Sequence, residues 1–205
     1  MHYTLASTGA AALLSLLSLT SALPTSSTTE KRTPVDLAPR CGTTVYPSYI
    51  SYVDSSISNT AVGPQYSVSA SSQPLGPWRV AQVQFSLPAG ITNGPCELRY
   101  GFPSSASITV TGTKSPPQLQ VQKSLGAFSP ADTWNTKPGV GSLYGTVKPE
   151  PNQAASVNSE TCAATLSYYV QTFEQWELSG GSAPNSGVEF AQQDGVQGFY
   201  LTYGC

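Results

Sequence analysis

The sequence predicts an all-β domain, built as a two-sheet antiparallel sandwich or jelly roll of about ten strands and fastened by two disulfides. Hydrophobic and polar residues alternate with a period of two in many short runs, which is typical of half-buried strands. Eighteen glycines and 17 prolines are scattered without a period, which indicates frequent turns. Because no long run with helical periodicity separates the strands, we expect antiparallel pairing.

The clearest predicted strand spans residues 78–87, where Ala81, Val83 and Phe85 share one face and two glutamines share the other. Similar runs follow along the chain, and clusters of Gly, Pro, Asn and Ser separate them. The predicted strands span residues 65–71, 78–87, 97–102, 107–111, 118–123, 143–148, 164–171, 173–178, 187–192 and 197–203.

The first 32 residues predict export followed by proprotein cleavage. An apolar run of nine residues, Ala11 to Leu19, precedes small side chains that end at Ala22, which is the pattern of a signal peptide. Nine residues cannot span a bilayer, which needs about 20. The dibasic pair Lys31 and Arg32 ends a stretch rich in Pro, Ser and Thr, so a processing protease should reach it.

These signals divide the chain into a signal peptide over 1–22, a pro-segment over 23–32, a short linker over 33–40 and a single β-sandwich domain over 41–205. We therefore expect a secreted protein, located in the extracellular space or the cell wall. The chain ends on a cysteine without an apolar tail, so we expect no lipid or membrane anchor. No Asn-x-Ser/Thr acceptor occurs, so we expect no N-glycan.

The processed product would start at Thr33 and contain no histidine, because His2 is the only one. This loss removes most nucleophilic triads and histidine metal sites. The product would keep 7 basic and 10 acidic residues, which argues against nucleic-acid binding. Only 10% of the chain is charged, so the surface must consist largely of hydroxyl and amide groups that suit neutral polymers.

All four cysteines lie in the mature part, and an even number in an exported chain indicates two disulfides. Four cysteines allow three pairings. We favour Cys41 with Cys205, because these two bracket the domain, which leaves Cys96 with Cys162. Zinc ligation needs close cysteine pairs and usually histidines, and neither is present. We therefore predict no metal and no cofactor.

A glycosidase needs only two carboxylates, so the acidic residues are the candidate catalytic groups. Glu174 and Glu177 are three residues apart and should face opposite sides of a strand, whereas Glu177 and Glu189 could meet across neighbouring strands. Scattered acids are more often solubilising charges, and we predict no catalytic residue. The acids considered are Asp54, Glu97, Asp132, Glu160, Glu174, Glu177, Glu189 and Asp194.

The aromatic residues could form a flat platform for sugar rings, and core filling is the alternative. Tyr46, Tyr49 and Tyr52 recur every three residues. Adjacent Tyr168 and Tyr169 point to opposite faces of a strand, so we expect one of them to be exposed. The segment around Trp134 should form a turn with the indole packed beneath it. No ligand-binding residue can be singled out.

Four features resemble the fungal ubiquitin-3-binding-protein C-terminal domain family. They are the strand Cys96-Glu97-Leu98-Arg99-Tyr100-Gly101-Phe102-Pro103, the turn from Thr133 to Pro138 with the following Gly141 and Leu143-Tyr144-Gly145, the final Phe199 to Cys205, and Cys41 with Tyr46-Pro47. The resemblance covers roughly residues 41–205. It implies a secreted or wall-associated protein without assigned catalysis and supplies no catalytic residue. An exported chain would not meet the cytoplasmic partner in the family name.

We therefore expect a noncatalytic secreted β-domain, a component of the cell wall or extracellular matrix in contact with polysaccharide or with an extracellular protein. Two alternatives stay open. One is a secreted glycan-active enzyme that uses two carboxylates, and the other is a secreted interaction or effector protein. The oligomeric state stays open as well.

Overall fold

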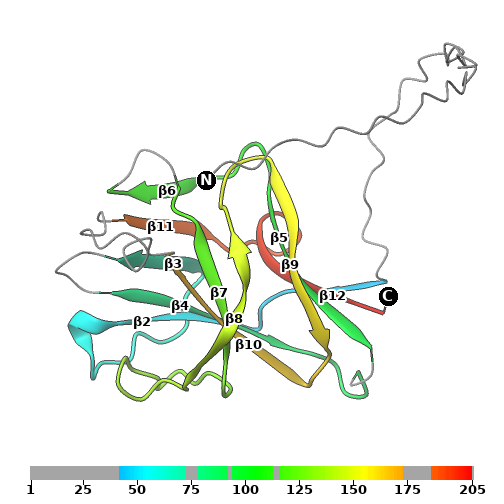
Figure 1. Cartoon of the computed structure of the whole chain (residues 1–205), viewed down its shortest axis with the longest axis horizontal. Helices are drawn as coiled ribbons and strands as arrows, with labels where there is room; N and C mark the ends of the chain where they lie inside the picture. The colour runs from blue at the N-terminus through cyan, green and yellow to red at the C-terminus, as the bar shows by residue number, and fades with distance from the viewer. Residues whose placement is uncertain (1–41, 73–77, 92–93, 113–115, 173–185, 205) are drawn as a thin grey trace, which may run out of the picture. The chain divides into compact units, whose positions relative to one another are not determined.

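A computed structural model describes residues 42–72, 78–91, 94–112, 116–172 and 186–204, all within one unit that spans Leu37–Cys205. This described part contains twelve strands and a single 3-10 turn, so the predicted all-β class is confirmed and the strand number is larger than expected (Figure 1). The elements are β1 (Thr43–Val45), β2 (Tyr49–Asp54), η1 (Ser55–Ile57), β3 (Ser67–Ser72), β4 (Arg79–Ser86), β5 (Pro95–Phe102), β6 (Ile108–Thr111), β7 (Leu119–Ser124), β8 (Val140–Val147), β9 (Gln153–Thr161), β10 (Thr165–Thr172), β11 (Ser186–Ala191) and β12 (Gly198–Tyr203).

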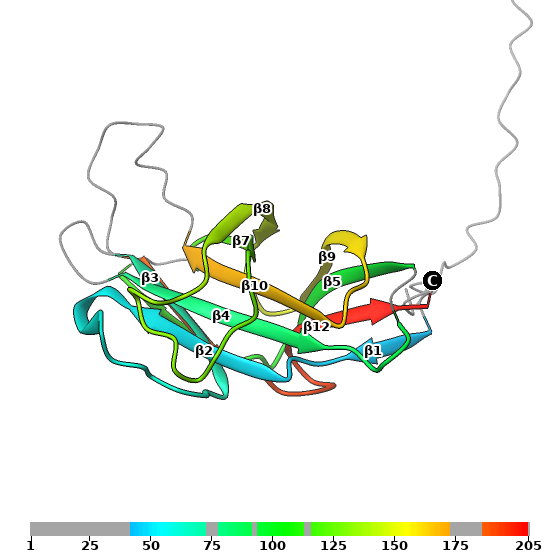
Figure 2. The same ribbon diagram turned by 90° about the horizontal axis from the view of Figure 1, so that it is seen from below.

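The strands form two antiparallel sheets. The smaller sheet has the order β1-β12-β5-β9, and the larger one has the order β6-β11-β3-β4-β10-β7-β8 with β2 paired to β4. In Figure 2, β2, β4 and β10 run side by side. The contact between β3 and β4 consists of one register pair, Ser71 with Arg79, so the larger sheet is weakly joined at this point.

Two continuous parts of the chain, β5 with β6 and β11 with β12, pair with each other once in each sheet and so link the sheets. The β5 strand continues into β6, and β11 continues into β12, while β5 pairs with β12 and β6 pairs with β11. Residues 103–107 and 192–197 therefore form a break in one long two-stranded ribbon. Such a break in a ladder leaves backbone and side chains free to shape a cavity.

The larger hydrophobic cluster joins residues of both sheets. Phe102 from the smaller sheet meets Phe190 from the larger one, with ring centroids 4.8 Å apart in an edge-to-face arrangement. Phe85 and Tyr168 pack edge to face at 6.1 Å in the same cluster. This inner face therefore consists of the alternate apolar residues that the sequence predicted to face the core.

A second cluster covers the opposite face of the larger sheet. It consists of Val53, Val80, Phe128 and Tyr169, with Trp134 packed against it. Phe128 and Trp134 belong to the segment 125–139, which passes across β4 and β2 in Figure 2. Both faces of the sheet are consequently buried here, which is why β4 is more buried than a strand with one wet face.

The expectation that one of Tyr168 and Tyr169 is exposed is wrong, because the segment 125–139 covers the second face of the sheet. They do point to opposite faces of β10, yet their exposed fractions are 1% and 0%. Tyr168 lies in the core between the sheets, and Tyr169 lies beneath the segment 125–139 with its hydroxyl donating to the carbonyl of Pro138 at 2.6 Å.

One disulfide lies in the described part and joins Cys96 of β5 to Cys162, just after β9, with Cα atoms 4.9 Å apart. This is the predicted pairing of Cys96 with Cys162, and it fastens two neighbouring strands of the smaller sheet. Cys41 and Cys205 lie outside the described residues, so their pairing stays a prediction. Among the residues that the structure describes, no helix has the length and apolar character that crossing a lipid bilayer would require.

Candidate functional site

A surface cavity of about 230 Å³ lies at the break between β11 and β12. It is lined by Thr44, Tyr46, Gly101, Gln193, Gly195, Val196, Gln197, Gly198, Phe199 and Tyr200. These residues come from β1 and the turn after it, from the end of β5, and from the 192–197 loop with the start of β12. We call this feature the tyrosine cavity, because Tyr46 and Tyr200 are its half-buried aromatic side chains.

The loop of the tyrosine cavity is held by backbone and glutamine hydrogen bonds. Gln193 and Gln197 form an isolated bridge in which each amide donates to the other's carbonyl at 2.9 Å. The side chain of Gln192 accepts from the amide of Phe199 at 2.8 Å and donates to the same residue's carbonyl at 2.9 Å. These hydrogen bonds attach the loop to the end of the sheet.

Two glycines permit this geometry. Gly198 has a φ of +107°, and a Cβ there would lie 2.1 Å from Oε1 of Gln192, in the space that the glutamine uses to reach Phe199. Gly195 has a φ of +73°, and a Cβ there would lie 3.6 Å from the hydroxyl of Tyr46. Side chains at these two positions would close or distort the tyrosine cavity.

The lining is uncharged, and it combines aromatic rings with hydroxyl and amide groups. Tyr46 and Tyr200 are half-buried, so a ring face or edge of each stays available to a ligand. Sites of this kind use a few polar groups for orientation and apolar surface for affinity. The arrangement suits a small neutral ligand that offers both hydroxyl groups and apolar C–H faces.

The three tyrosines with a spacing of three do not form one platform. Tyr46 lines the tyrosine cavity, whereas Tyr49 packs against the second cluster and donates its hydroxyl to the carbonyl of Ser129 at 3.2 Å. Tyr52 lies under the guanidinium of Arg79, 4.3 Å from its ring centroid. Sequence spacing alone therefore grouped residues that the fold separates.

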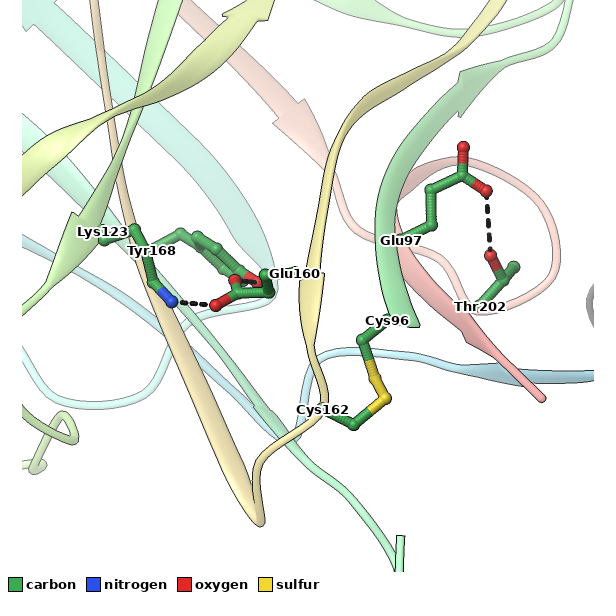
Figure 3. The surroundings of a disulfide bond; sticks show 7 residues. All are labelled: Cys96, Glu97, Lys123, Glu160, Cys162, Tyr168 and Thr202. Atoms are coloured by element: carbon green, nitrogen blue, oxygen red, sulfur yellow. Dashed lines mark hydrogen bonds and ion pairs between the residues drawn. A yellow bond between two sulfur atoms is a disulfide. The ribbon is translucent and has the colours of Figure 1, made fainter. Parts of the chain in front are cut away.

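Among the acidic residues, Glu160 has the most elaborate surroundings. Its carboxylate pairs with Lys123 and accepts a hydrogen bond from the hydroxyl of Tyr168 at 2.5 Å (Figure 3). Burial raises the pKa of Tyr168, and the hydrogen bond to Glu160 and its negative charge add to this effect. Burial also raises the pKa of Tyr144, whose hydroxyl is buried without a hydrogen-bond partner among the described residues. This cluster ties β7 and β10 to β9, so we interpret it as a structural latch between the sheets.

Glu97 and Glu160 lie on neighbouring strands but do not converge. Cys96 is opposite Glu160 in the register, so Glu160 shares the inner face of Cys96, while Glu97 points to the outer face. Figure 3 shows Glu160 directed toward Lys123 and Glu97 directed away from it. Glu97 instead pairs with Arg99 at 3.3 Å. These two carboxylates therefore cannot flank one glycosidic bond.

Of the other acidic residues considered, three accept hydrogen bonds from neighbouring side chains or amides, one is exposed and two lie outside the described residues. Burial opposes ionisation of Asp54, but hydrogen bonds from the side chain and backbone of Ser56 and from Arg79 hold its pKa below the ordinary value. Asp132 accepts hydrogen bonds from Gln82 at 3.2 Å and from the amide of Ser129 at 3.0 Å, and Glu189 accepts one from Ser67 at 3.0 Å. Asp194 is exposed in the loop of the tyrosine cavity, and Glu174 and Glu177 lie outside the described residues.

Trp134 lies in the segment 125–139 and is half-buried against the second cluster. The ammonium group of Lys137 lies 4.0 Å from the centroid of its ring and donates to its backbone carbonyl at 2.6 Å. Burial lowers the pKa of Lys137. The indole therefore supports the segment over the sheet and is not a free stacking surface.

Sequence reasoning missed most of the tyrosine cavity. It grouped Tyr46 with its neighbours, and it treated Tyr200 as one residue of a terminal strand. The available signal was the pair Gly195 and Gly198, because two glycines within four residues predict a sharp change of direction inside an apparent strand. The predicted processing residues Ala22, Lys31 and Arg32 lie outside the described residues.

No group of three or more His, Cys, Asp or Glu side chains within the described ranges is arranged to hold a metal ion. The tyrosine cavity likewise has hydroxyl and amide groups but no carboxylate in its lining. What the arrangement can do chemically is bind a neutral ligand by hydrogen bonds and ring contacts.

Comparison with known proteins supports the resemblance noted from the sequence. No curated protein matches the chain. A family model described as Ubiquitin 3 binding protein But2 C-terminal domain matches residues 45–185. The match runs from the last residue of β1 through β10, so it includes Tyr46 and the disulfide but ends before β11, β12 and Tyr200. Because the match spans more than half of the chain, this protein belongs to the But2 C-terminal domain family.

Proposed function

We propose that this chain is an exported, noncatalytic β-domain that binds neutral polysaccharide of the cell wall or extracellular matrix in the tyrosine cavity. The observation that carries the proposal is the lining itself, in which Tyr46 and Tyr200 accompany hydroxyl and amide groups without any charged side chain. The leader and the dibasic pair in the sequence support export.

The surroundings of the acids support a noncatalytic role. Glu97 and Glu160 face opposite sides of the smaller sheet, and each is paired with a cation. Asp54 is likewise paired, at 3.3 Å from Arg79. Carboxylates that act on a glycosidic bond must instead face each other across a groove, about 5 to 10 Å apart.

A protein partner is the second candidate, because the family description names a ubiquitin 3 binding protein. The chain also exposes apolar side chains near β8, with exposed fractions of 75% for Leu125, 45% for Val140 and 56% for Leu143. A Leu143→Ser variant that keeps polysaccharide binding but loses a co-purifying protein would favour this candidate.

The test is retention of the exported protein on insoluble chitin, β-glucan and purified cell wall. We expect retention at both low and high salt, because an uncharged lining gives a binding energy that salt screens little. Recovery of all the protein in the unbound fraction under both conditions would remove the polysaccharide proposal.

The same preparation tests export and processing. Amino-terminal sequencing of the native protein from wall or medium should give Thr33 as the first residue. Unprocessed protein recovered from cytosol with reduced cysteines would contradict the extracellular role and would favour an intracellular protein partner.

A further inference from the structure

The size of the tyrosine cavity limits what it can hold. Its volume of about 230 Å³ is below the roughly 300–1,000 Å³ of sites that enclose drug-sized ligands. A long polymer therefore cannot enter as a whole. A single ring of the polymer can enter, while the rest of the polymer stays on the surface of the smaller sheet.

The charge of the surroundings limits the ligand further. None of the ten lining residues carries a charge at neutral pH. A charged ring that left water to enter this space would lose hydration without gaining an ion-pair partner, and this loss is strongly unfavourable.

Arg99 and Asp194 are next to the lining in the strand register and in the loop, and neither of them lines the cavity. Arg99 lies opposite Tyr200 in the register of β5 and β12, and it pairs with Glu97 at 3.3 Å. Glu97 also accepts a hydrogen bond from Thr202 at 3.5 Å. Asp194 is in the loop of the tyrosine cavity, but it is exposed to solvent and does not line the cavity. Its charge is therefore screened by water and salt.

We propose that the tyrosine cavity selects one uncharged sugar ring, which contacts Tyr46 and Tyr200 with its C–H face and edge, and that it rejects sugar rings with a net charge. This inference rests on the proposed function and adds the chemical class of the ligand. The hydroxyl of Thr44 and the amide of Gln193 are the polar groups of the lining that orient the ring.

A matched pair of soluble sugars tests the selection. The N-acetylated chitin trimer is neutral, and the fully deacetylated trimer has the same length and linkage but is cationic at pH 6. We expect calorimetry with the exported protein to show at least tenfold weaker binding of the cationic trimer. A neutral glucan trimer and the corresponding uronate trimer form a second pair, in which we expect the anion to bind at least tenfold more weakly.

Variants locate the binding. Tyr46→Ala and Tyr200→Ala should each weaken binding of the neutral trimer at least tenfold, because each removes one ring contact. Tyr66→Ala is the matched control, because Tyr66 is 90% exposed and lies outside the cavity, and it should bind like the wild type. Tyr200→Phe keeps the ring, so retained binding by this variant would show that stacking and not folding is at stake.

The outcomes separate this inference from the proposed function. Equal binding of neutral and charged trimers would overturn the selection. If cationic trimers bind best and Asp194→Asn abolishes that preference, the loop carboxylate governs binding and the inference is wrong. Unchanged binding by both tyrosine→Ala variants would also overturn it while leaving polysaccharide binding intact. Failure of the wild type to bind any polymer or trimer would instead overturn the proposed function.

Discussion

Gly198 shows how one residue shapes the candidate site. Its positive φ and the side chain of Gln192 together leave no room for a Cβ, and Gln192 depends on that room to bind both the amide and the carbonyl of Phe199. The loop, the start of β12 and the wall of the tyrosine cavity therefore depend on a glycine that has no chemistry of its own.

Gly198→Ala should consequently destabilise the protein by about 1–3 kcal/mol, because it forces a non-glycine residue into a strained backbone conformation and displaces Gln192. Urea denaturation measures this change. Gly101→Ala is the control from the same cavity, since its Cβ would meet Tyr200 and Ala154 at ordinary distances of 3.7 and 3.9 Å. Similar losses in both variants would contradict the strain argument.

The raised pKa of Tyr169 predicts that the free energy of unfolding falls at alkaline pH. Burial raises its pKa to about 12, while an unfolded tyrosine titrates near 10. Between these values the unfolded state binds fewer protons than the folded state, so the free energy of unfolding falls as pH rises, by about 1.4 kcal/mol per pH unit for such a tyrosine. The contribution is complete below pH 10 and is lost between pH 10 and 12.

Tyr169→Phe should be less stable than wild type at pH 8 by about 1 kcal/mol, because it loses the hydrogen bond to Pro138. The deficit should shrink above pH 10, where only the wild type loses this contribution. Unfolding curves at pH 8, 10 and 11 test this trend, and a constant deficit would show that the phenol of Tyr169 titrates normally. Tyr66→Phe, which changes an exposed side chain, should match wild type at each pH.

At the scale of elements, the segment 125–139 is the main departure from a simple sandwich. It turns through the hydrogen bond from the amide of Asp132 to the carbonyl of Ser129, at 3.0 Å, and its residue Phe128 packs edge to face on Tyr169 at 4.9 Å. Gln84 accepts a hydrogen bond from the amide of Phe128 at 2.6 Å. A polar residue of β4 thus serves to attach the segment to the sheet.

Phe128→Ala should cost about 3–5 kcal/mol, because it removes a buried ring and leaves a cavity above Tyr169. The control is Leu125→Ala in the same segment, whose side chain is 75% exposed and whose loss should change stability by less than about 0.5 kcal/mol. Chemical denaturation of both variants decides the matter. Comparable small effects would mean that the segment does not support the sheet.

The alternation of residue types predicted nine of the twelve described strands, and the tenth predicted strand, 173–178, lies outside the described residues. The strand β4 alternates clearly and lies within one residue of its predicted bounds. In contrast, β9 was missed because its residues are mostly small and polar and both of its faces are largely exposed, so no hydrophobic period marks it. The three-residue β1 is too short to show a period, and the tyrosines of β2 suggested a platform instead of a strand.

The candidate site was less predictable than the fold. The tyrosine cavity combines Tyr46 with Tyr200, which are far apart in sequence and meet only because β1 pairs with β12. Tyr168 and Tyr169 are both buried because the segment 125–139 covers the second face of the larger sheet. A period of two gives the face on which a residue lies, but it does not say which other segment covers that face.

At the scale of the whole molecule, covalent and ionic links hold the smaller sheet together and join it to the larger one. The disulfide between Cys96 and Cys162 closes a sequence separation of 66 residues, and the pair Lys123 with Glu160 connects the two sheets close by (Figure 3). With few charged residues available, the chain places one of its ion pairs at this junction.

Replacement of both Cys96 and Cys162 by alanine should lower the free energy of unfolding by about 4 kcal/mol, as the chain-entropy model gives for a loop of this length. Thermal and urea unfolding without reductant measure the loss. Peptide mapping of the wild-type protein without reductant reports the pairing, and a linkage of Cys41 to Cys96 would contradict both the structure and the predicted pairing. A loss below 1 kcal/mol would show that the ion pair and the packing hold the smaller sheet together without the disulfide.

In our proposal, the tyrosine cavity is where this protein binds its ligand. The most direct measurement is an NMR titration of the isotopically labelled, exported protein with the neutral chitin and glucan trimers. Backbone amide shifts should concentrate in residues 193–198 and around Tyr46, with smaller changes elsewhere. Shifts confined to β7 and β8, or spectra that do not change at millimolar trimer, would contradict the claim.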